Sequence, residues 1–291
     1  MPHVLLASCA EARGLDDDEP LLVGALADAG LIAQGVDWAD PGVDWAAADL
    51  VVVRSTWDYA PRRAEFLAWA RRVEADTALH NSAAVLEWNT DKRYLAELAA
   101  AGLPVVPTVW AAEAAALPAA LGRWDGDVVV KPVVSAGARD TARFAPAERS
   151  GAAVFARRIL DSGRPVMVQP YLTRLDAEGE TGLVYLDGVL SHAFRKGALL
   201  AGAALGPGLY AEEEIEARTA TPEQRAVGDA VLAATDDRTG GPPLYARVDL
   251  VPGDGGEPVL IELELTEPSL FLATGEGAAV RVAAAIRARL S

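Results

Sequence analysis

The stretch from Tyr245 to Leu265 constrains the fold of this chain most, and it reads YARVDLV, PGDGGE and PVLIELEL. Apolar residues alternate with other residues on both sides of a turn rich in Pro, Gly and Asp, a pattern typical of a β-hairpin. If Val251 pairs with Pro258, Arg247 lies opposite Glu262. The period of two then puts four charged residues on one face and six apolar residues on the other. These are Arg247, Asp249, Glu262 and Glu264 against Ala246, Val248, Leu250, Val259, Ile261 and Leu263. The pattern fixes which face is apolar but not the pairing.

Two interpretations of the charged face stay open. It is either a solvent-exposed surface with ordinary ion pairs or a site for a hard cation. Carboxylate oxygens at short spacing, without His or Cys among them, suit Mg²⁺ or Mn²⁺ rather than zinc. Mg²⁺ held by few carboxylates usually takes its other ligands from phosphates and water. The second interpretation therefore predicts a phosphate site elsewhere in the chain.

Length and composition bound the class of protein. With 291 residues and 51% hydrophobic content, the chain can form two or three subdomains. It has no apolar run as long as a membrane span and its start lacks a signal-peptide pattern, which predicts a cytoplasmic protein that does not bind membranes. A net charge of −16 argues against a nucleic-acid partner. Cys9, the only cysteine, excludes an intrachain disulfide and is expected to be buried.

Lysine is used in only three places, Lys92, Lys131 and Lys196, although the chain has 26 basic residues. Lysine is favoured over arginine where a compact point charge meets phosphate. Lys92 is expected in the first turn of a helix that begins near Asn89 or Thr90. Lys131 follows three valines of a buried strand and so requires an anionic partner. The small-residue turn SAGA at 135–138 can cradle phosphate oxygens with its backbone N–H groups.

The first 80 residues read as strand, helix, strand and strand, which predicts an open α/β layer. No G-x-G-x-x-G turn follows the first strand and no P-loop pattern occurs in the chain, which removes two common nucleotide-binding classes. The segment RSTWDY follows the third apolar run, at the strand end where ligands bind in such sheets. It is either a ligand site that includes Arg54, Ser55, Trp57 and Asp58 or a capped loop with Trp57 as a packing residue.

The middle of the chain holds a strand broken by Pro170 and a second hairpin with an Asp-Gly turn at residues 187–188. His192 in that hairpin is expected to be structural. Arg195 and Lys196 end its second strand together. The glycine- and alanine-rich segment from Gly197 to Tyr210 suits a lid over an active site.

With the acidic hairpin, the three lysines and the broken strand QPYL, the chain resembles the ATP-grasp ligases, especially the glutathione synthetase and RimK-like branch. The resemblance implies a fold of α/β and α+β type. An N-terminal open α/β domain over residues 1–80, the pre-ATP-grasp domain, precedes a two-subdomain ATP-grasp fold over residues 81–175 and 176–291.

The resemblance also implies roles for individual residues. Those expected to bind ATP are Lys92, Lys131, Ser135, Ala136, Gly137, Gln169, Pro170, Tyr171, Leu172, Glu180 and Lys196. The expected metal ligands are Asp249, Glu262 and Glu264, the last where many members have Asn. Arg247, Lys131 and Arg195 are the expected catalytic residues. Arg54, Ser55, Trp57, Asp58 and Ser269 are the substrate candidates.

The implied activity is an ATP- and Mg²⁺-dependent carboxylate–amine ligase that releases ADP and forms an amide through an acyl phosphate, with Mn²⁺ as an alternative metal. Its substrates would be small and amino-acid-like. The elements RSTWDY and LTEPSLFL look most like small ligases of antibiotic pathways, including the D-cycloserine-forming type, whose amide closes within one molecule. The alternative from another class is a catalytically silent ATP-binding regulatory protein. Family members are often dimers or tetramers.

Overall fold

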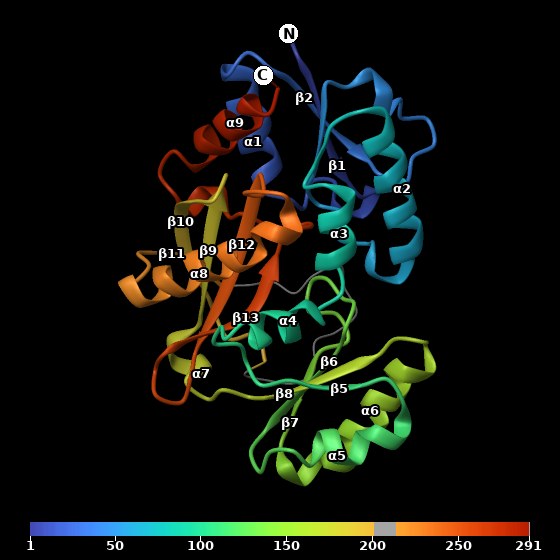
Figure 1. Ribbon diagram of the computed structural model, residues 1–291, viewed down its shortest axis with the longest axis vertical. Coiled ribbons are helices and arrows are strands. Elements are labelled where there is room, and N and C mark those ends of the chain that lie inside the picture. Colours follow the sequence, from blue (N-terminus) through green and yellow to red (C-terminus); the bar gives the residue numbers. More distant parts are fainter. Residues whose placement is uncertain (201–213, 291) are drawn as a thin grey trace.

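The computed structural model describes residues 1–200 and 214–290 and contains three β-sheets that follow one another along the chain (Figure 1). The first is parallel, in the order β2-β1-β3-β4, with β1 His3–Ser8, β2 Ile32–Asp37, β3 Leu50–Val53 and β4 Leu79–His80. The second is antiparallel, in the order β5-β8-β6-β7, with β5 Val109–Ala111, β6 Val128–Pro132, β7 Ala142–Phe144 and β8 Val166–Pro170. The third is antiparallel, in the order β11-β10-β9-β12-β13, with β9 Glu180–Leu186, β10 Val189–Lys196, β11 Ile215–Arg218, β12 Tyr245–Pro252 and β13 Pro258–Glu264.

The helices lie between and around these sheets (Figure 1). They are α1 Asp18–Asp28, α2 Arg63–Asp76, α3 Ala83–Asn89, α4 Tyr94–Ala100, α5 Leu117–Leu121, α6 Arg149–Asp161, α7 Leu175–Glu178, α8 Pro222–Thr239 and α9 Ala278–Ala288. Each sheet takes its strands from one of the three segments predicted as domains, while the boundaries at residues 80 and 175 remain a prediction. Mixed parallel and antiparallel sheets with helices confirm the predicted fold class.

The first sheet is covered on both faces because residues 4–7 of β1 and all four residues of β3 are apolar. Leu5, Ala7, Val51 and Val53 pack against Phe66 and Trp69 of α2. The alternate residues Val4, Leu6, Leu50 and Val52 turn to the other face, toward α1 and α9. A parallel sheet buried on both sides is the usual result of such uninterrupted apolar strands.

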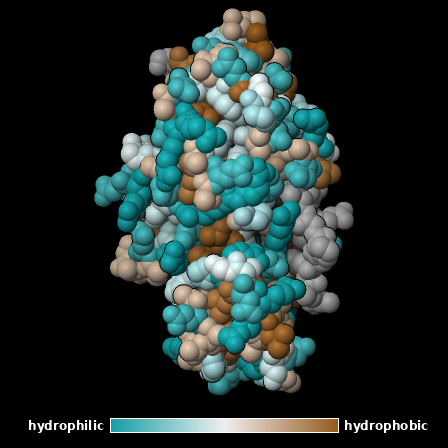
Figure 2. All heavy atoms as spheres, turned by 90° about the vertical axis from the view of Figure 1, so that its right-hand side faces the viewer, coloured by the Kyte–Doolittle hydropathy of each residue, from teal (hydrophilic) through white to brown (hydrophobic). Residues whose placement is uncertain are grey.

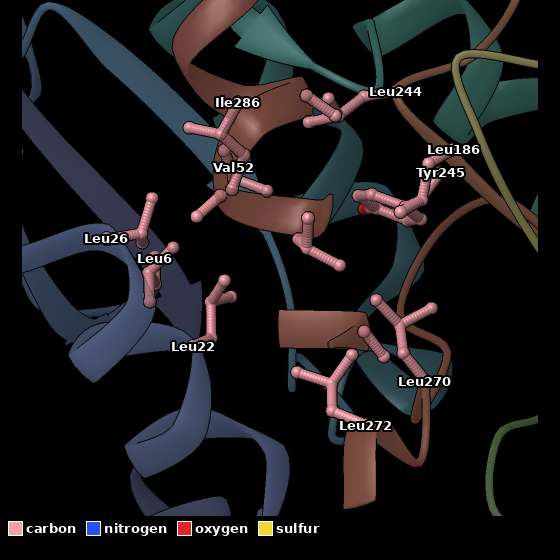
Figure 3. Packing of buried hydrophobic residues seen from close by; sticks show 14 of the residues in the cluster. Leu6, Leu22, Leu26, Val52, Leu186, Leu244, Tyr245, Leu270, Leu272 and Ile286 are labelled. Atoms are coloured by element: carbon pink, nitrogen blue, oxygen red, sulfur yellow. The ribbon is translucent and has the colours of Figure 1, made fainter. Parts of the chain in front are cut away.

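The second of these cores joins the two ends of the chain. Figure 3 shows Leu6, Leu22 and Leu26 on one side and Ile286, Leu270 and Leu272 on the other, around one apolar centre. Leu22 and Leu26 come from α1, and Ile286 comes from α9, which packs on α1 (Figure 1). Residues 270–272 of the segment after β13 are therefore held against the N-terminal sheet.

Local signals in the sequence are largely confirmed. Asp187 and Gly188 form the tight turn of the second hairpin, with φ of 48° and 77°. Thr221 caps α8 and accepts a hydrogen bond from the Gln224 backbone N–H at 3.2 Å. Cys9 is buried. The helical pattern after Asn89 is interrupted, since α3 ends there and α4 begins only at residue 94.

The face of the molecule in Figure 2 is mostly hydrophilic, and its hydrophobic residues form small groups. Among the described residues, the helices include none that is both long and apolar enough to cross a membrane.

Candidate active site

The acidic hairpin of β12 and β13 has a different register from the one predicted. Arg247 lies opposite Glu264, not Glu262, and Asp249 lies opposite Glu262. Val251 pairs with Val259 and not with Pro258, which shifts the register by one residue, and a bulge after Asp249 shifts it by one more. The four charged residues still gather on one face. Ile261, predicted in the apolar core, lines the cavity instead.

The hairpin is fixed by polar side chains from the preceding helices. Asn89 donates to the Leu263 carbonyl at 2.8 Å and accepts from the Leu265 N–H at 2.7 Å. The Tyr94 hydroxyl makes bonds of 2.8 and 2.9 Å to the backbone of Leu263. Lys92 lies between these two anchors, in the turn between α3 and α4, and not in the first turn of a helix as predicted.

All three lysines are buried, and Lys92 and Lys196 form ion pairs with carboxylates. The Lys92 ammonium lies 3.0 Å from a Glu262 oxygen and donates to the Ser135 carbonyl at 2.7 Å. The Lys196 ammonium lies 2.5 Å from Glu180 and 3.3 Å from Asp249. Lys131 is buried in β6. Burial lowers the pKa of Lys131, while the charge of Glu262 acts in the opposite direction.

Arg247 is the second centre of this charge network. Its guanidinium donates to both Asp249 oxygens, at 2.7 Å from Nη2 and 2.9 Å from Nε, and also pairs with Glu264. Burial favours neutral Asp249, but Arg247 and Lys196 outweigh it and lower its pKa to about 2. Burial raises the pKa of Glu264 to about 7, since Arg247 offsets burial only in part and Glu262 and Asp249 add repulsion.

Except for Asp249, which is buried outside the wall, these groups line a cavity of about 630 Å³. Its wall includes most of the predicted site: Trp57, Lys92, Lys131, Ser135, Ala136, Gly137, Gln169, Pro170, Tyr171, Leu172, Glu180, Lys196, Arg247, Glu262, Glu264 and Ser269. The wall takes residues from the second and third sheets and from the segments that follow β1 and β3 of the first. A cavity of this size suits a nucleotide with a small molecule.

Two of the predicted residues are directed elsewhere. Arg195 is outside the cavity wall, because neighbours in a strand point to opposite faces and Lys196 points inward. It donates to the Glu178 carbonyl at 3.0 Å. Asp58 is also outside the wall, and it accepts hydrogen bonds from Trp38 at 2.7 Å and Arg62 at 3.1 Å.

Arg54 and Ser55 lie behind the wall. One Arg54 nitrogen is 3.5 Å from Asp18, and its Nη1 is buried without a hydrogen-bond partner in the part of the chain described. The Ser55 hydroxyl donates to Asp16. The structure therefore places both as supports of the acidic segment that begins α1.

The acidic segment was not predicted as part of the site, because in the sequence it is only a polar stretch between a strand and a helix. Asp16, Asp17 and Asp18 all line the cavity. Asp18 accepts the backbone N–H groups of residues 270, 271 and 272, at 2.6, 3.0 and 2.6 Å. It thereby fixes the segment after β13, which contains Glu267, a second cavity residue that was missed.

The carboxylates of the hairpin offer the oxygen donors that Mg²⁺ prefers. As arranged, they are turned toward Lys92, Lys196 and Arg247, and no group of three or more His, Cys, Asp or Glu within residues 1–200 and 214–290 is positioned to hold a metal ion. The donor chemistry fits Mg²⁺, whereas a three-carboxylate cage does not form. The predicted ligand set stays a prediction.

The predicted lid falls mainly outside the described residues. Its first part, residues 197–200, lines the cavity. Residues 201–210 are not among those described. His192, expected to be structural, contacts the Leu270 carbonyl at 2.8 Å.

Known proteins resemble this chain over its full length. A family model for the N-terminal domain of D-cycloserine synthetase DcsG matches residues 4–81. The cycloserine biosynthesis protein DcsG of Streptomyces lavendulae is 40% identical in an alignment 300 residues long. The alignment covers 100% of this chain and 99% of the relative. The crystal structure of D-cycloserine synthetase DcsG has a TM-score of 0.92 at 39% identity and covers 99% of this chain and 100% of its own.

More distant structures share the fold. The ATP-grasp ligase PsnB, complexed with precursor peptide PsnA2 and AMPPNP, has a TM-score of 0.63 at 21% identity and covers 99% of this chain and 98% of its own. The D-alanine–D-alanine ligase of Bacillus anthracis, complexed with ATP, has a TM-score of 0.68 at 13% identity and covers 100% of this chain and 97% of its own.

Proposed function

Because the chain belongs to the family of the D-cycloserine synthetase DcsG and is an ATP-dependent carboxylate–amine ligase, we propose that it closes the ring of D-cycloserine or a close analogue. The ring of D-cycloserine contains one amide, whose nitrogen is bonded to the ring oxygen. Opening that amide gives O-amino-D-serine, with the carboxylate and the attacking amine in one molecule. The proposed reaction is therefore an intramolecular amide formation.

The observation that carries this proposal is the convergence of charge in one cavity. Lys92, Lys131 and Lys196 come from three separate segments and meet the charged face of the β12–β13 hairpin there. Buried cations of this kind are costly unless anions compensate them. A triphosphate with Mg²⁺, or with Mn²⁺, supplies both the anions and the missing counter-charge for the carboxylates.

The chain's own residues then have defined tasks. ATP would supply the phosphoryl group that activates the substrate carboxylate. Lys92, Lys131 and residues 135–137 would hold the phosphates, with Gln169–Leu172 along the adenine and Glu180 at the ribose. Asp249, Glu262 and Glu264 would hold the metal. Arg247 would stabilise negative charge on the transferring group.

Substrate size also supports a small-molecule ligase. Trp57 and Ser269 also line the cavity, which holds about 630 Å³. A nucleotide leaves room for a molecule of amino-acid size. A homodimer or homotetramer and a location in the cytoplasm remain predictions.

Incubation of the protein with O-amino-D-serine and Mg-ATP tests the proposal. We expect ADP release and a product whose mass equals the substrate minus one water. D-Serine, which lacks the attacking amine, serves as the matched control and should give no ring.

Other outcomes identify the alternatives. A product of two substrate molecules minus one water indicates intermolecular ligation. AMP release contradicts an acyl-phosphate route. ATP binding without turnover on any amino-acid substrate indicates the silent regulatory protein.

A further inference from the structure

Glu267 is the carboxylate of the cavity wall whose charge is not balanced. The residue is 8% exposed and lines the cavity. Within residues 1–200 and 214–290, its carboxylate makes no hydrogen bond and no ion pair. Its backbone is fixed, because the Trp57 indole N–H donates to the Glu267 carbonyl at 3.2 Å.

The other carboxylates of the wall all have partners, apart from Asp17, which is exposed. These pairs are Asp16 with Ser55, Asp18 with Arg54 and three backbone N–H groups, Glu180 with Lys196, Glu262 with Lys92, and Glu264 with Arg247. Burial raises the pKa of Glu267 well above its ordinary value, and the charge of Glu264 raises it further. A carboxylate buried without a partner is destabilising, so a cation from outside the chain would be strongly favoured beside it.

The surroundings of Glu267 indicate which cation fits. The segment that carries it wraps around Arg247, whose guanidinium donates to the Ser269 carbonyl at 2.9 Å and lies 5.9 Å from the centre of the Phe271 ring. Arg247 is close enough to act on the charge of Glu267. A cation and an anion therefore stand near each other on one wall. An α-amino acid presents the complementary pair, since its carboxylate and ammonium are bonded to the same carbon.

We propose that Glu267 binds the α-ammonium group of the substrate, the amine that does not react. The inference rests on the proposed function. An O-amino amino acid carries two amines, and the aminooxy nitrogen is much the weaker base, so it stays neutral when the α-amine is protonated. Glu267 would hold the protonated α-amine and so orient the substrate, which leaves the neutral aminooxy nitrogen free to attack the activated carboxylate. The residue thus sets the substrate class.

The test compares Glu267→Gln, which keeps shape and removes charge, with Glu113→Gln at an exposed position. Activation of the carboxylate is followed as ADP release, with hydroxylamine added to trap the activated acyl group. The substrates are O-amino-D-serine and its counterpart with a hydroxyl in place of the α-amine. A hydrogen bond between charged groups contributes about 1.5–3 kcal/mol. The wild type should therefore favour the amine by roughly 10- to 100-fold in kcat/KM.

In Glu267→Gln this preference should disappear through a higher KM for the amine substrate, while KM for ATP changes less than about twofold. Glu113→Gln should behave as the wild type. The melting temperature should be unchanged or higher, since an unbalanced buried charge is removed, and Glu267→Asp should restore part of the preference. An intact preference in Glu267→Gln overturns the inference, as does an equal loss of ATP affinity. If the wild type releases no ADP with any substrate, the proposed function itself has failed.

Discussion

The two ends of the cavity balance their charges in different ways. At the hairpin end, Asp249, Glu262 and Glu264 are each paired with a lysine or arginine of the chain. At the N-terminal end, Asp18 accepts three backbone N–H groups of the segment after β13, whose Glu267 has no partner among the described residues. In the function proposed above, the hairpin end exchanges its internal partners for a metal nucleotide. The N-terminal end supports the segment that carries the unpaired carboxylate.

The largest expected effect comes from the hairpin end. Glu262→Gln leaves the Lys92 and Lys131 charges without their shared anion and removes a candidate metal ligand. We expect turnover to fall by about 10³-fold or more, with the circular dichroism spectrum unchanged. Steady-state ADP release measures this. A variant with full activity would contradict the assigned role of the hairpin.

Loss of the lysine in β10 should weaken nucleotide binding specifically. Lys196→Met removes the ammonium that joins Glu180 and Asp249. We expect KM for ATP to rise by roughly 10- to 100-fold, the size of a charge-assisted contact, with less change in substrate KM. Calorimetric titration with a nonhydrolysable ATP analogue checks this. Equal rises in KM for ATP and for the substrate would contradict the assignment of separate roles to the two ends.

At the N-terminal end, a substitution should affect stability and substrate binding. Asp18→Asn weakens the acceptors of three backbone N–H groups and leaves Arg54 uncompensated. We expect a loss of at least about 2 kcal/mol in the free energy of unfolding and a roughly tenfold rise in substrate KM. An exposed acid at the other end of α1 provides the control, Asp28→Asn, which should change neither. An Asp18→Asn protein with normal stability would show that the segment after β13 is held by other contacts.

The smallest effect is expected for Arg195, the neighbour of Lys196 in β10. Arg195→Ala should leave kcat and both KM values within about twofold, because this side chain points away from the cavity. Its ion pair with Glu216 spans 3.8 Å with a largely exposed partner, so little stability should be lost. A large fall in kcat would restore the catalytic role predicted from the sequence.

Periodicity and residue type predicted much of this architecture. Alternation in β12 and β13 placed four charged residues on one face, and the scarcity of lysine marked three positions that all line the cavity. The bulge after Asp249 could not be predicted, because an extra residue in one strand leaves no mark in a period-two pattern. The predicted register was wrong for that reason and because Val251 pairs with Val259 rather than with Pro258. The side on which Ile261 lies was wrong with it.

The missed residues depend on contacts far apart in the sequence. Asp18 reads locally as one acid among several at the start of a helix, and only the fold brings the segment after β13 to it. Arg54 stands at a strand end where ligands often bind, yet the same fold gives it Asp18 as a partner. Glu267 belongs to LTEPSLFL, a segment that carried part of the family resemblance. The local pattern of that segment does not show which of its side chains face the cavity.

The packing of α9 on the first sheet affects how the chain must fold. Val4 and Leu6 belong to β1, whereas Val282 and Ile286, which complete the same core, come later in the chain than the described strands of all three sheets. One apolar face of the N-terminal layer therefore stays incompletely covered during most of synthesis. Contacts of such long sequence separation slow folding. The wall that closes the cavity at its N-terminal end is consequently among the last parts of the molecule to form.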